Sequence, residues 1–315
     1  MDIVVLGRIG YDLYSEEPYT PLSKVRRFSR YLGGSSANMA VGLSRLGAKV
    51  GVVACLGDDA LSQFLVDFLK AEGVDTDHVK TAPGFMASLC LTEISPPDKF
   101  PQVFYRHDAV DIQLKVDESD LAFAASGKMF VTNGTSLCAS PSRESTYRAM
   151  ERAKDAGCRV VFDVDFRSMS WPSAAEAGLA VRLALPYVDV LIGNQPELML
   201  TAGVDDLDQA VRKLRGRVPT LVSKLGAEGT RVWTGDDSVF LAPYKVDVVS
   251  TIGAGDGFAS GFLYGLSQAM PLIECLHHGN AAAAIVVSRL SCSEAMPTLA
   301  EVREIMNNQR GAHVQ

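Results

Sequence analysis

Short apolar segments rich in β-branched residues alternate with segments of helical periodicity along most of the chain, and this alternation constrains the fold more than any other feature. The apolar segments cover residues 3–6, 50–56, 129–132, 160–164, 188–192 and 221–223. The helical segments between them cover residues 36–46, 60–72, 141–156, 174–185 and 207–215. Strands that are apolar throughout are typical of a parallel sheet with helices on both faces. The order therefore predicts an α/β fold of three layers, α/β/α, with a mostly parallel central sheet.

Two stretches, residues 8–32 and 84–112, interrupt the alternation with charged, aromatic and proline residues. Loops of this length without secondary structure are uncommon inside a domain. We therefore expect a small β-sheet that lies over one edge of the main sheet as a lid; the alternative is two long surface loops. The chain ends in further helical segments, which predicts one domain over residues 1–310 and a disordered tail at residues 311–315.

The composition argues against several classes of function. The net charge is -7 and the chain contains no long basic run, so nucleic-acid binding is not expected. No apolar stretch approaches the roughly 20 residues of a membrane span, and no basic segment of a signal peptide precedes residues 3–6. The six cysteines form no CxxC pair and the histidines lack metal spacing. We expect a cytoplasmic protein with reduced thiols, no structural zinc and no membrane partner.

Residues 250–258, which read STIGAGDGF, carry the strongest chemical signal. They follow an expected strand at residues 245–249 and open an apolar helix. The free N–H groups and the dipole of a helix start favour an anion such as a phosphate, and Asp256 in the first turn could accept the proton of a substrate hydroxyl. The alternative is an ordinary turn in which Asp256 caps the helix. The segment matches neither the dinucleotide fingerprint nor the P-loop.

Residues 33–38, which read GGSSAN, form a second candidate ligand segment. Two adjacent glycines let the backbone approach a ligand closely, and Asn38 offers both a donor and an acceptor to hydroxyl groups. The alternative is a turn in which Ser35 or Ser36 caps the following helix.

Together these two segments resemble the two signatures of the ribokinase-like (PfkB) carbohydrate kinases, and the resemblance covers nearly the whole length of the chain. It implies the ribokinase-like fold, with ATP and magnesium as cofactors of sugar phosphorylation. It also implies that Asp256 is the catalytic base and that the amides of Gly253, Ala254 and Gly255 form the anion hole. The residues that it places around the sugar are Asp12, Gly33, Gly34 and Asn38. Those that it places around the nucleotide are Asn194, Glu197, Ser223, Lys224, Gly226, Gly229 and Asn280.

Some of these assignments have structural alternatives. The family's NxxE motif, which organises magnesium through water, matches Asn194 and Glu197, but the same residues could simply start a helix. Residues 223–229 could be only a hairpin turn with glycines at positive φ. Asn280 lies in a helix of small residues that could serve tight packing alone.

Three residues indicate an acid sugar as the substrate. Tyr105 and Arg106 resemble the YR pair of the family's acid-sugar kinases, and residues 163–167 with Trp171 resemble a pattern of the 2-keto-3-deoxygluconate kinases. The resemblance implies that Tyr105, Arg106 and Arg167 bind substrate, and the planar arginine fork suits a carboxylate. The alternative for Arg167 is a surface ion pair with a nearby aspartate.

Four segments, residues 105–111, 140–144, 161–167 and 291–298, resemble the 5-dehydro-2-deoxygluconokinases of bacterial myo-inositol breakdown. The resemblance implies phosphorylation of the terminal hydroxyl of 5-dehydro-2-deoxy-D-gluconate. The alternatives are 2-keto-3-deoxygluconate kinase or another sugar kinase of the family, and a non-catalytic sugar-binding protein, which would not need the base Asp256. A nucleoside kinase would leave Arg106 and Arg167 without a carboxylate.

Two further expectations concern ions and assembly. Many members of the family carry an aspartate, which helps to bind a monovalent cation, where this chain has Ser250, so activation by such a cation is doubtful. A lid with apolar residues such as Phe85 and Leu89 would suit a homodimer contact.

Overall fold

A computed structural model describes residues 1–96 and 99–309. Within this part of the chain the buried apolar segments form one large sheet. Its strands are β1 (Ile3–Leu6), β4 (Val50–Leu56), β5 (Asp75–Thr81), β8 (Met129–Asn133), β9 (Arg159–Asp163), β10 (Val190–Asn194), β11 (Thr220–Lys224), β12 (Thr230–Thr234) and β13 (Asp237–Leu241). They lie in the order β13-β12-β11-β10-β9-β8-β1-β4-β5. All neighbours from β11 to β5 are parallel, and only β12 and β13 are antiparallel.

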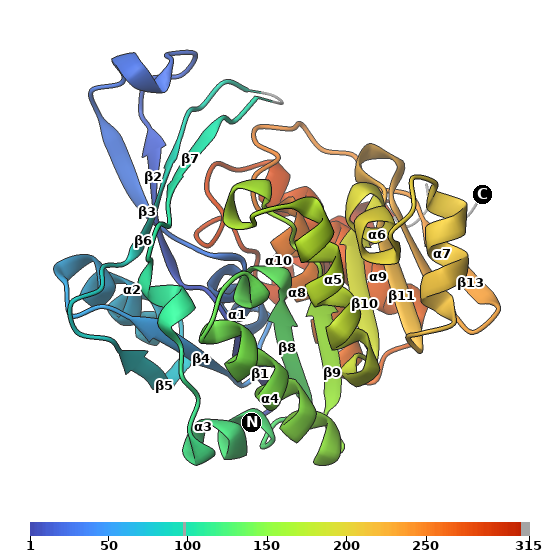
Figure 1. Cartoon of the computed structure of the whole chain (residues 1–315). Coiled ribbons are helices and arrows are strands. Elements are labelled where there is room, and N and C mark those ends of the chain that lie inside the picture. The colour runs from blue at the N-terminus through green and yellow to red at the C-terminus, as the bar shows by residue number, and fades with distance from the viewer. Residues whose placement is uncertain (97–98, 310–315) are drawn as a thin grey trace.

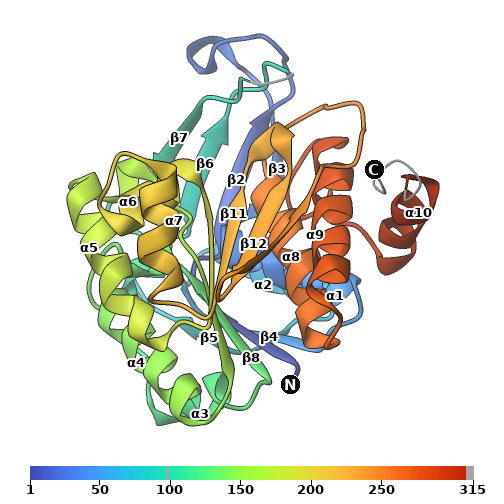
Figure 2. The ribbon, with the colours of Figure 1, turned by 90° about the vertical axis from the view of Figure 1, so that its right-hand side faces the viewer.

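Helices cover both faces of this sheet. They are α1 (Ser35–Arg45), α2 (Ala60–Ala71), α3 (Glu118–Ala124), α4 (Ser142–Asp155), α5 (Ala174–Ala184), α6 (Gln195–Ala202), α7 (Leu207–Arg215), α8 (Ala254–Ser267), α9 (Leu272–Val287) and α10 (Leu299–Gln309). Figure 2 shows α3 to α7 on one side of the sheet and α1, α8 and α9 on the other. The predicted three-layer α/β/α architecture is confirmed. None of the helices in the described ranges is long and apolar enough to cross a membrane.

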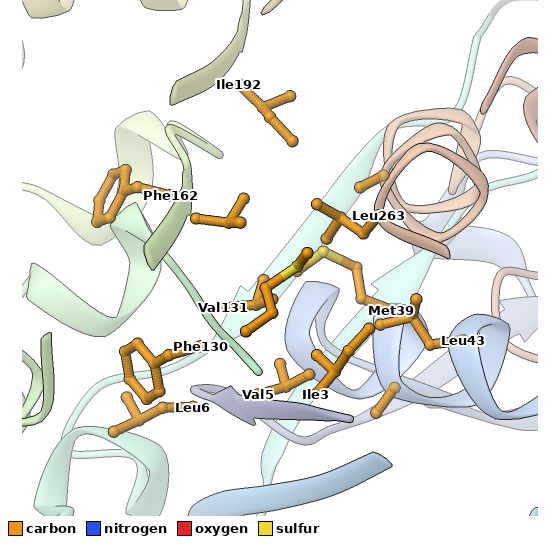
Figure 3. Packing of buried hydrophobic residues seen from close by; sticks show 14 of the residues in the cluster. Ile3, Val5, Leu6, Met39, Leu43, Phe130, Val131, Phe162, Ile192 and Leu263 are labelled. Carbon is orange, nitrogen blue, oxygen red and sulfur yellow. The ribbon is translucent and has the colours of Figure 1, made fainter. Parts of the chain in front are cut away.

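The core lies on both faces of the central strands because side chains alternate along a strand. Ile3 and Val131 point toward Met39 of α1 and Leu263 of α8, whereas Phe130 belongs to the opposite face (Figure 3). All five side chains are buried to 2% exposure or less, so the strands hold their carboxyl ends in fixed positions.

The two stretches that interrupt the alternation contribute a second, small sheet. Its strands are β2 (Gly10–Ser15), β3 (Phe28–Gly33), β6 (Ser88–Thr92) and β7 (Gln102–Tyr105), in the order β3-β2-β6-β7. β2 and β6 pair in parallel, and the two outer pairs are antiparallel. The chain enters this sheet from the end of β1 and leaves β3 directly into α1. The small sheet therefore rises from the carboxyl edge of the main sheet (Figure 1).

One expected strand, at residues 245–249, is wrong. The N–H groups of Val249 and Ser250 both donate to the carbonyl of Val287, at 2.8 and 3.0 Å, so the chain here is bound to the end of α9. Val248 and Val249 are both at least 40% exposed, so this segment adds no strand to the main sheet. The predicted tail at residues 311–315 lies outside the described residues.

Candidate active site

Asp256 is held at the start of α8 by two side chains of α1. The Oγ of Ser35 donates to its Oδ1 at 2.8 Å, and the Nδ2 of Asn38 donates to its Oδ2 at 2.8 Å. The two glycine-rich segments therefore meet in space, although more than 200 residues separate them in the sequence. The alternatives in which Ser35, Ser36 or Asp256 caps a helix are wrong, because the N-cap positions of α1 and α8 are glycines.

The surroundings of Asp256 suit a general base. Burial raises the pKa of its carboxyl group above the ordinary value, and Asp165 adds to the rise, while Asn38, Ser35 and Arg167 oppose it. The residue keeps partial contact with solvent. Both carboxylate oxygens are thus oriented by donors, and a substrate hydroxyl can still reach them.

Both helices that meet here begin without a side-chain cap. Their N-cap residues, Gly34 and Gly253, have left-handed backbone with φ of 92° and 80°. The first N–H groups of a helix have no partner within the helix, so an uncapped start leaves donors for an anion. A Cβ on Gly253 would lie 2.9 Å from the Sγ of Cys292. The loop of residues 291–298 therefore packs directly against this turn. The anion-hole role of Gly253, Ala254 and Gly255 stays a prediction.

Asp12 reaches the same region from β2. A Cβ on the neighbouring Gly33 of β3 would lie 2.2 Å from the Asp12 carboxylate, which explains the glycine. Burial raises the pKa of Asp12 to about 6; Arg8 and Arg167 oppose this rise and Asp256 adds to it. The Oδ1 of Asp12 is buried without a hydrogen-bond partner in the described structure, and a sugar hydroxyl could supply the missing donor.

A cation lies beside the start of α8 at the end of β11. The Nζ of Lys224 is 3.1 and 3.0 Å from the two carboxylate oxygens of Asp163, which ends β9. Burial alone would lower the pKa of Lys224, but the attraction of Asp163 and Glu197 outweighs it and raises the pKa. A Cβ on Gly255 would lie 3.4 Å from Nζ, so the ammonium group borders the amides predicted to hold the phosphoryl group.

Arg167 lies in the loop after β9 and is paired with Asp165. The Nη2 to Oδ1 distance is 2.9 Å, and 48% of the Arg167 side chain is exposed. The attraction of Asp165 raises the pKa of Arg167, and Asp256 and Glu197 add to the rise. The structure therefore contains the ion pair between Arg167 and an aspartate that was the alternative to substrate binding. This pair lies at the edge of the site.

Asn194 and Glu197 form a capping box at the start of α6. The Oδ1 of Asn194 accepts the N–H of Glu197 at 3.0 Å, and the Oε2 of Glu197 accepts the N–H of Asn194 at 2.7 Å. The Oε1 of Glu197 accepts the N–H of Phe166 at 3.0 Å. A carboxylate oxygen can accept more than one donor, so water molecules around a magnesium ion fit here. The contact of Glu197 with magnesium through water stays a prediction.

The guanidinium group of Arg106 is already bound by other side chains of the protein. Its guanidinium group pairs with Asp111 and donates to the Oγ of Ser170 at 2.7 Å. Tyr105 is 62% exposed. Among the described residues no hydrogen bond joins either of them to Asp12 or Asp256, and their role in substrate binding stays a prediction.

The other residues predicted to meet the nucleotide lie along the β11–β12 hairpin and α9. Gly226 and Gly229, with φ of 61° and 115°, shape the turn of the hairpin. The Oγ of Ser223 is buried and has no partner in the described structure. Asn280 accepts from Thr230 and donates to two backbone carbonyls, so its amide is fully engaged within the protein.

The sequence interpretation missed three residues of this region. Ser35 was given only an alternative role as a helix cap, Asp163 was only one residue of the pattern at residues 163–167, and Arg8 was given no role. An aspartate that directly follows an apolar strand, as Asp163 does, is a usable signal because the carboxyl ends of parallel strands border ligand crevices. No local pattern distinguishes Arg8.

A hollow of about 830 Å³ lies at the opposite edge of the sheet. Residues that begin strands line it, among them Met129, Arg159, Val190 and Thr220. None of the candidate site residues lines it, so the site is assigned from its chemistry and not from cavity size.

Residues 1–299 match the pfkB family carbohydrate kinase profile. The chain is 36% identical over 317 aligned positions to a 5-dehydro-2-deoxygluconokinase of Geobacillus kaustophilus, covering 98% of this chain and 95% of that protein. It is 38% identical over 313 positions to a 5-dehydro-2-deoxygluconokinase of Shouchella clausii, covering 98% and 96%. A fructokinase of Xylella fastidiosa with bound ATP superimposes with a TM-score of 0.85 at 26% identity, over 98% of this chain and 99% of that one.

Proposed function

We propose that this chain, which belongs to the pfkB family of carbohydrate kinases, transfers the γ-phosphoryl group of ATP to the terminal hydroxyl of 5-dehydro-2-deoxy-D-gluconate. Its class is that of the ATP-dependent carbohydrate kinases. The observation that carries the proposal is the Asp256 carboxylate, oriented by Ser35 and Asn38 at an uncapped helix start.

In this mechanism the base and the phosphoryl site are neighbours on one helix. Asp256 takes the proton of the terminal hydroxyl as the hydroxyl oxygen attacks the γ-phosphorus. The bond from that phosphorus to the oxygen of the β-phosphate breaks, and ADP leaves. The amides of Gly253 to Gly255 and the ammonium group of Lys224 stabilise the charge on the transferring group. Asp12 holds a further hydroxyl and so aligns the sugar.

Magnesium fits the carboxylates at the edge of the sheet. Glu197 would hold its water shell, since both carboxylate oxygens are fixed by backbone N–H groups and can accept further donors. When bound, the ion neutralises phosphate charge. The dimer through the small sheet, closure of that sheet over the site and a cytoplasmic location remain predictions.

The near alternative is 2-keto-3-deoxygluconate kinase. ADP release in the presence of magnesium, measured with both acid sugars side by side, separates the two. We expect a higher kcat/KM with 5-dehydro-2-deoxygluconate, in line with the relatives. Preference for 2-keto-3-deoxygluconate would overturn the proposed substrate and keep the kinase chemistry.

A further inference from the structure

Arg8 is a buried cation with free donors. It lies between β1 and β2 and is only 8% exposed. Its Nε and Nη1 atoms are shielded from solvent and have no hydrogen-bond partner within the described residues. A buried charged donor without a partner is costly, and in native proteins such a group calls for an explanation.

The guanidinium group lies against the small sheet beside Asp12. A Cβ on Gly10 would come 2.6 Å from its Nη1 and 3.3 Å from the Oγ of Ser88. The guanidinium carbon is 5.6 Å from the centre of the Phe104 ring. Asp12, Ser88 and Phe104 belong to three neighbouring strands and share one face by register, since Asp12 pairs with Cys90 and Cys90 with Phe104.

Arg8 and Asp12 attract each other without forming an ion pair. No nitrogen of Arg8 lies within 4.0 Å of a carboxylate oxygen in the described structure. The Oδ1 of Asp12 is itself buried without a partner. One bound molecule could satisfy both residues. Its hydroxyl group would donate to the Oδ1 of Asp12, and its anionic oxygen would accept from the Nε or Nη1 of Arg8.

We propose that Arg8 binds the carboxylate of the acid sugar while Asp12 binds a hydroxyl of the same molecule, so that Arg8 determines the specificity for acid over neutral sugars. This inference rests on the proposed function and deepens it. Of the arginines considered, Arg106 is engaged by Asp111, and Arg167 is paired with Asp165 and half exposed. Arg106 also has a buried Nε without a partner in the described structure, but its charge is balanced by Asp111, whereas Arg8 has two such atoms and no carboxylate oxygen within 4.0 Å.

Steady-state kinetics of Arg8→Gln and Arg8→Lys test the inference on two substrates, 5-dehydro-2-deoxygluconate and its uncharged methyl ester. Loss of a buried charged partner predicts a KM for the acid that is higher in Arg8→Gln by about 30-fold or more. The kcat, the KM for ATP and the kcat/KM for the ester should stay within about threefold, and Arg8→Lys should recover part of the loss. Arg27→Gln, a change of an exposed arginine of the small sheet region, is the matched control and should leave every constant unchanged.

Two outcomes would overturn the inference while leaving the proposed function intact. One is an unchanged KM for the acid in Arg8→Gln, and the other is an equal loss with acid and ester, which would mean that Arg8 only supports the fold. Thermal unfolding of each variant shows whether the fold is retained, and Arg8→Lys keeps the test valid if Arg8→Gln does not fold. A wild-type enzyme without turnover on acid sugars would instead refute the proposed function, and this inference with it.

Discussion

Replacing Asp12 by asparagine should stabilise the protein while weakening sugar binding. The carboxyl group ionises near 3.8 when exposed, but burial raises its pKa to about 6 in the folded protein. The folded state therefore holds the proton more tightly than the unfolded state, and this group costs the protein stability as the pH rises from about 4 to about 6. At about 1.36 kcal/mol per pKa unit the full cost is about 3 kcal/mol above pH 7. Asparagine carries no charge and avoids this cost.

The assay is urea unfolding of the wild type, Asp12→Asn and, as a control, the exposed Asp205→Asn. At pH 8 we expect the free energy of unfolding of Asp12→Asn to exceed that of the wild type by up to about 3 kcal/mol, and at pH 5 by about half as much. Asp205→Asn should change it by less than about 0.5 kcal/mol at both pH values. The reasoning fails if Asp12→Asn is no more stable at pH 8, or if its advantage grows as the pH falls.

Three further variants test the catalytic arrangement. Asp256→Asn should lower kcat by about 10²- to 10⁴-fold, while the sugar affinity measured by calorimetry stays within about threefold of the wild type. A variant that is folded and active would refute the assignment of Asp256 as the base. Gly33→Ala places a Cβ 2.2 Å from the Asp12 carboxylate and should raise the sugar KM at least about tenfold, and an unchanged KM would place Asp12 outside the sugar site. Lys224→Met leaves Asp163 buried without its cation. Urea unfolding should therefore show a free energy of unfolding lower by about 3–5 kcal/mol. A variant as stable as the wild type would show that Asp163 is protonated in the folded protein.

The elements that bury a continuous apolar surface could be predicted well from the sequence. The strands at residues 3–6 and 50–56 and the helix at residues 207–215 have the predicted bounds, because their periodicity and their flanking residues agree. The edge strand β5 and the short helix α3 were not predicted. β5 has one buried side chain in seven, and α3 is only seven residues long, so neither gives a strong apolar signal.

The site was predictable only where a local motif carries the chemistry. The two glycine-rich segments led to Asp256 and Asn38 because glycines before a helix let a ligand approach the backbone closely, and the structure joins these two side chains by a hydrogen bond. Pairings across the fold have no such signal. That Arg106 is engaged by Asp111, and that Arg8 is unpaired, depends on how the small sheet packs, which no short segment specifies.

The charges of the site explain why helix starts and magnesium are needed for anionic substrates. Two of its cations are already neutralised, since Lys224 pairs with Asp163 and Arg167 pairs with Asp165. The side chains therefore offer little net positive charge to ATP near Asp256, apart from the local attraction of the Lys224 ammonium group, and Asp256 is itself anionic when it acts as a base. Backbone amides supply attraction without a counter-ion, and a metal that travels with the phosphates supplies the rest. Arg8 belongs to neither of these ion pairs, so its charge is available for the second anion that we propose, the carboxylate of the sugar.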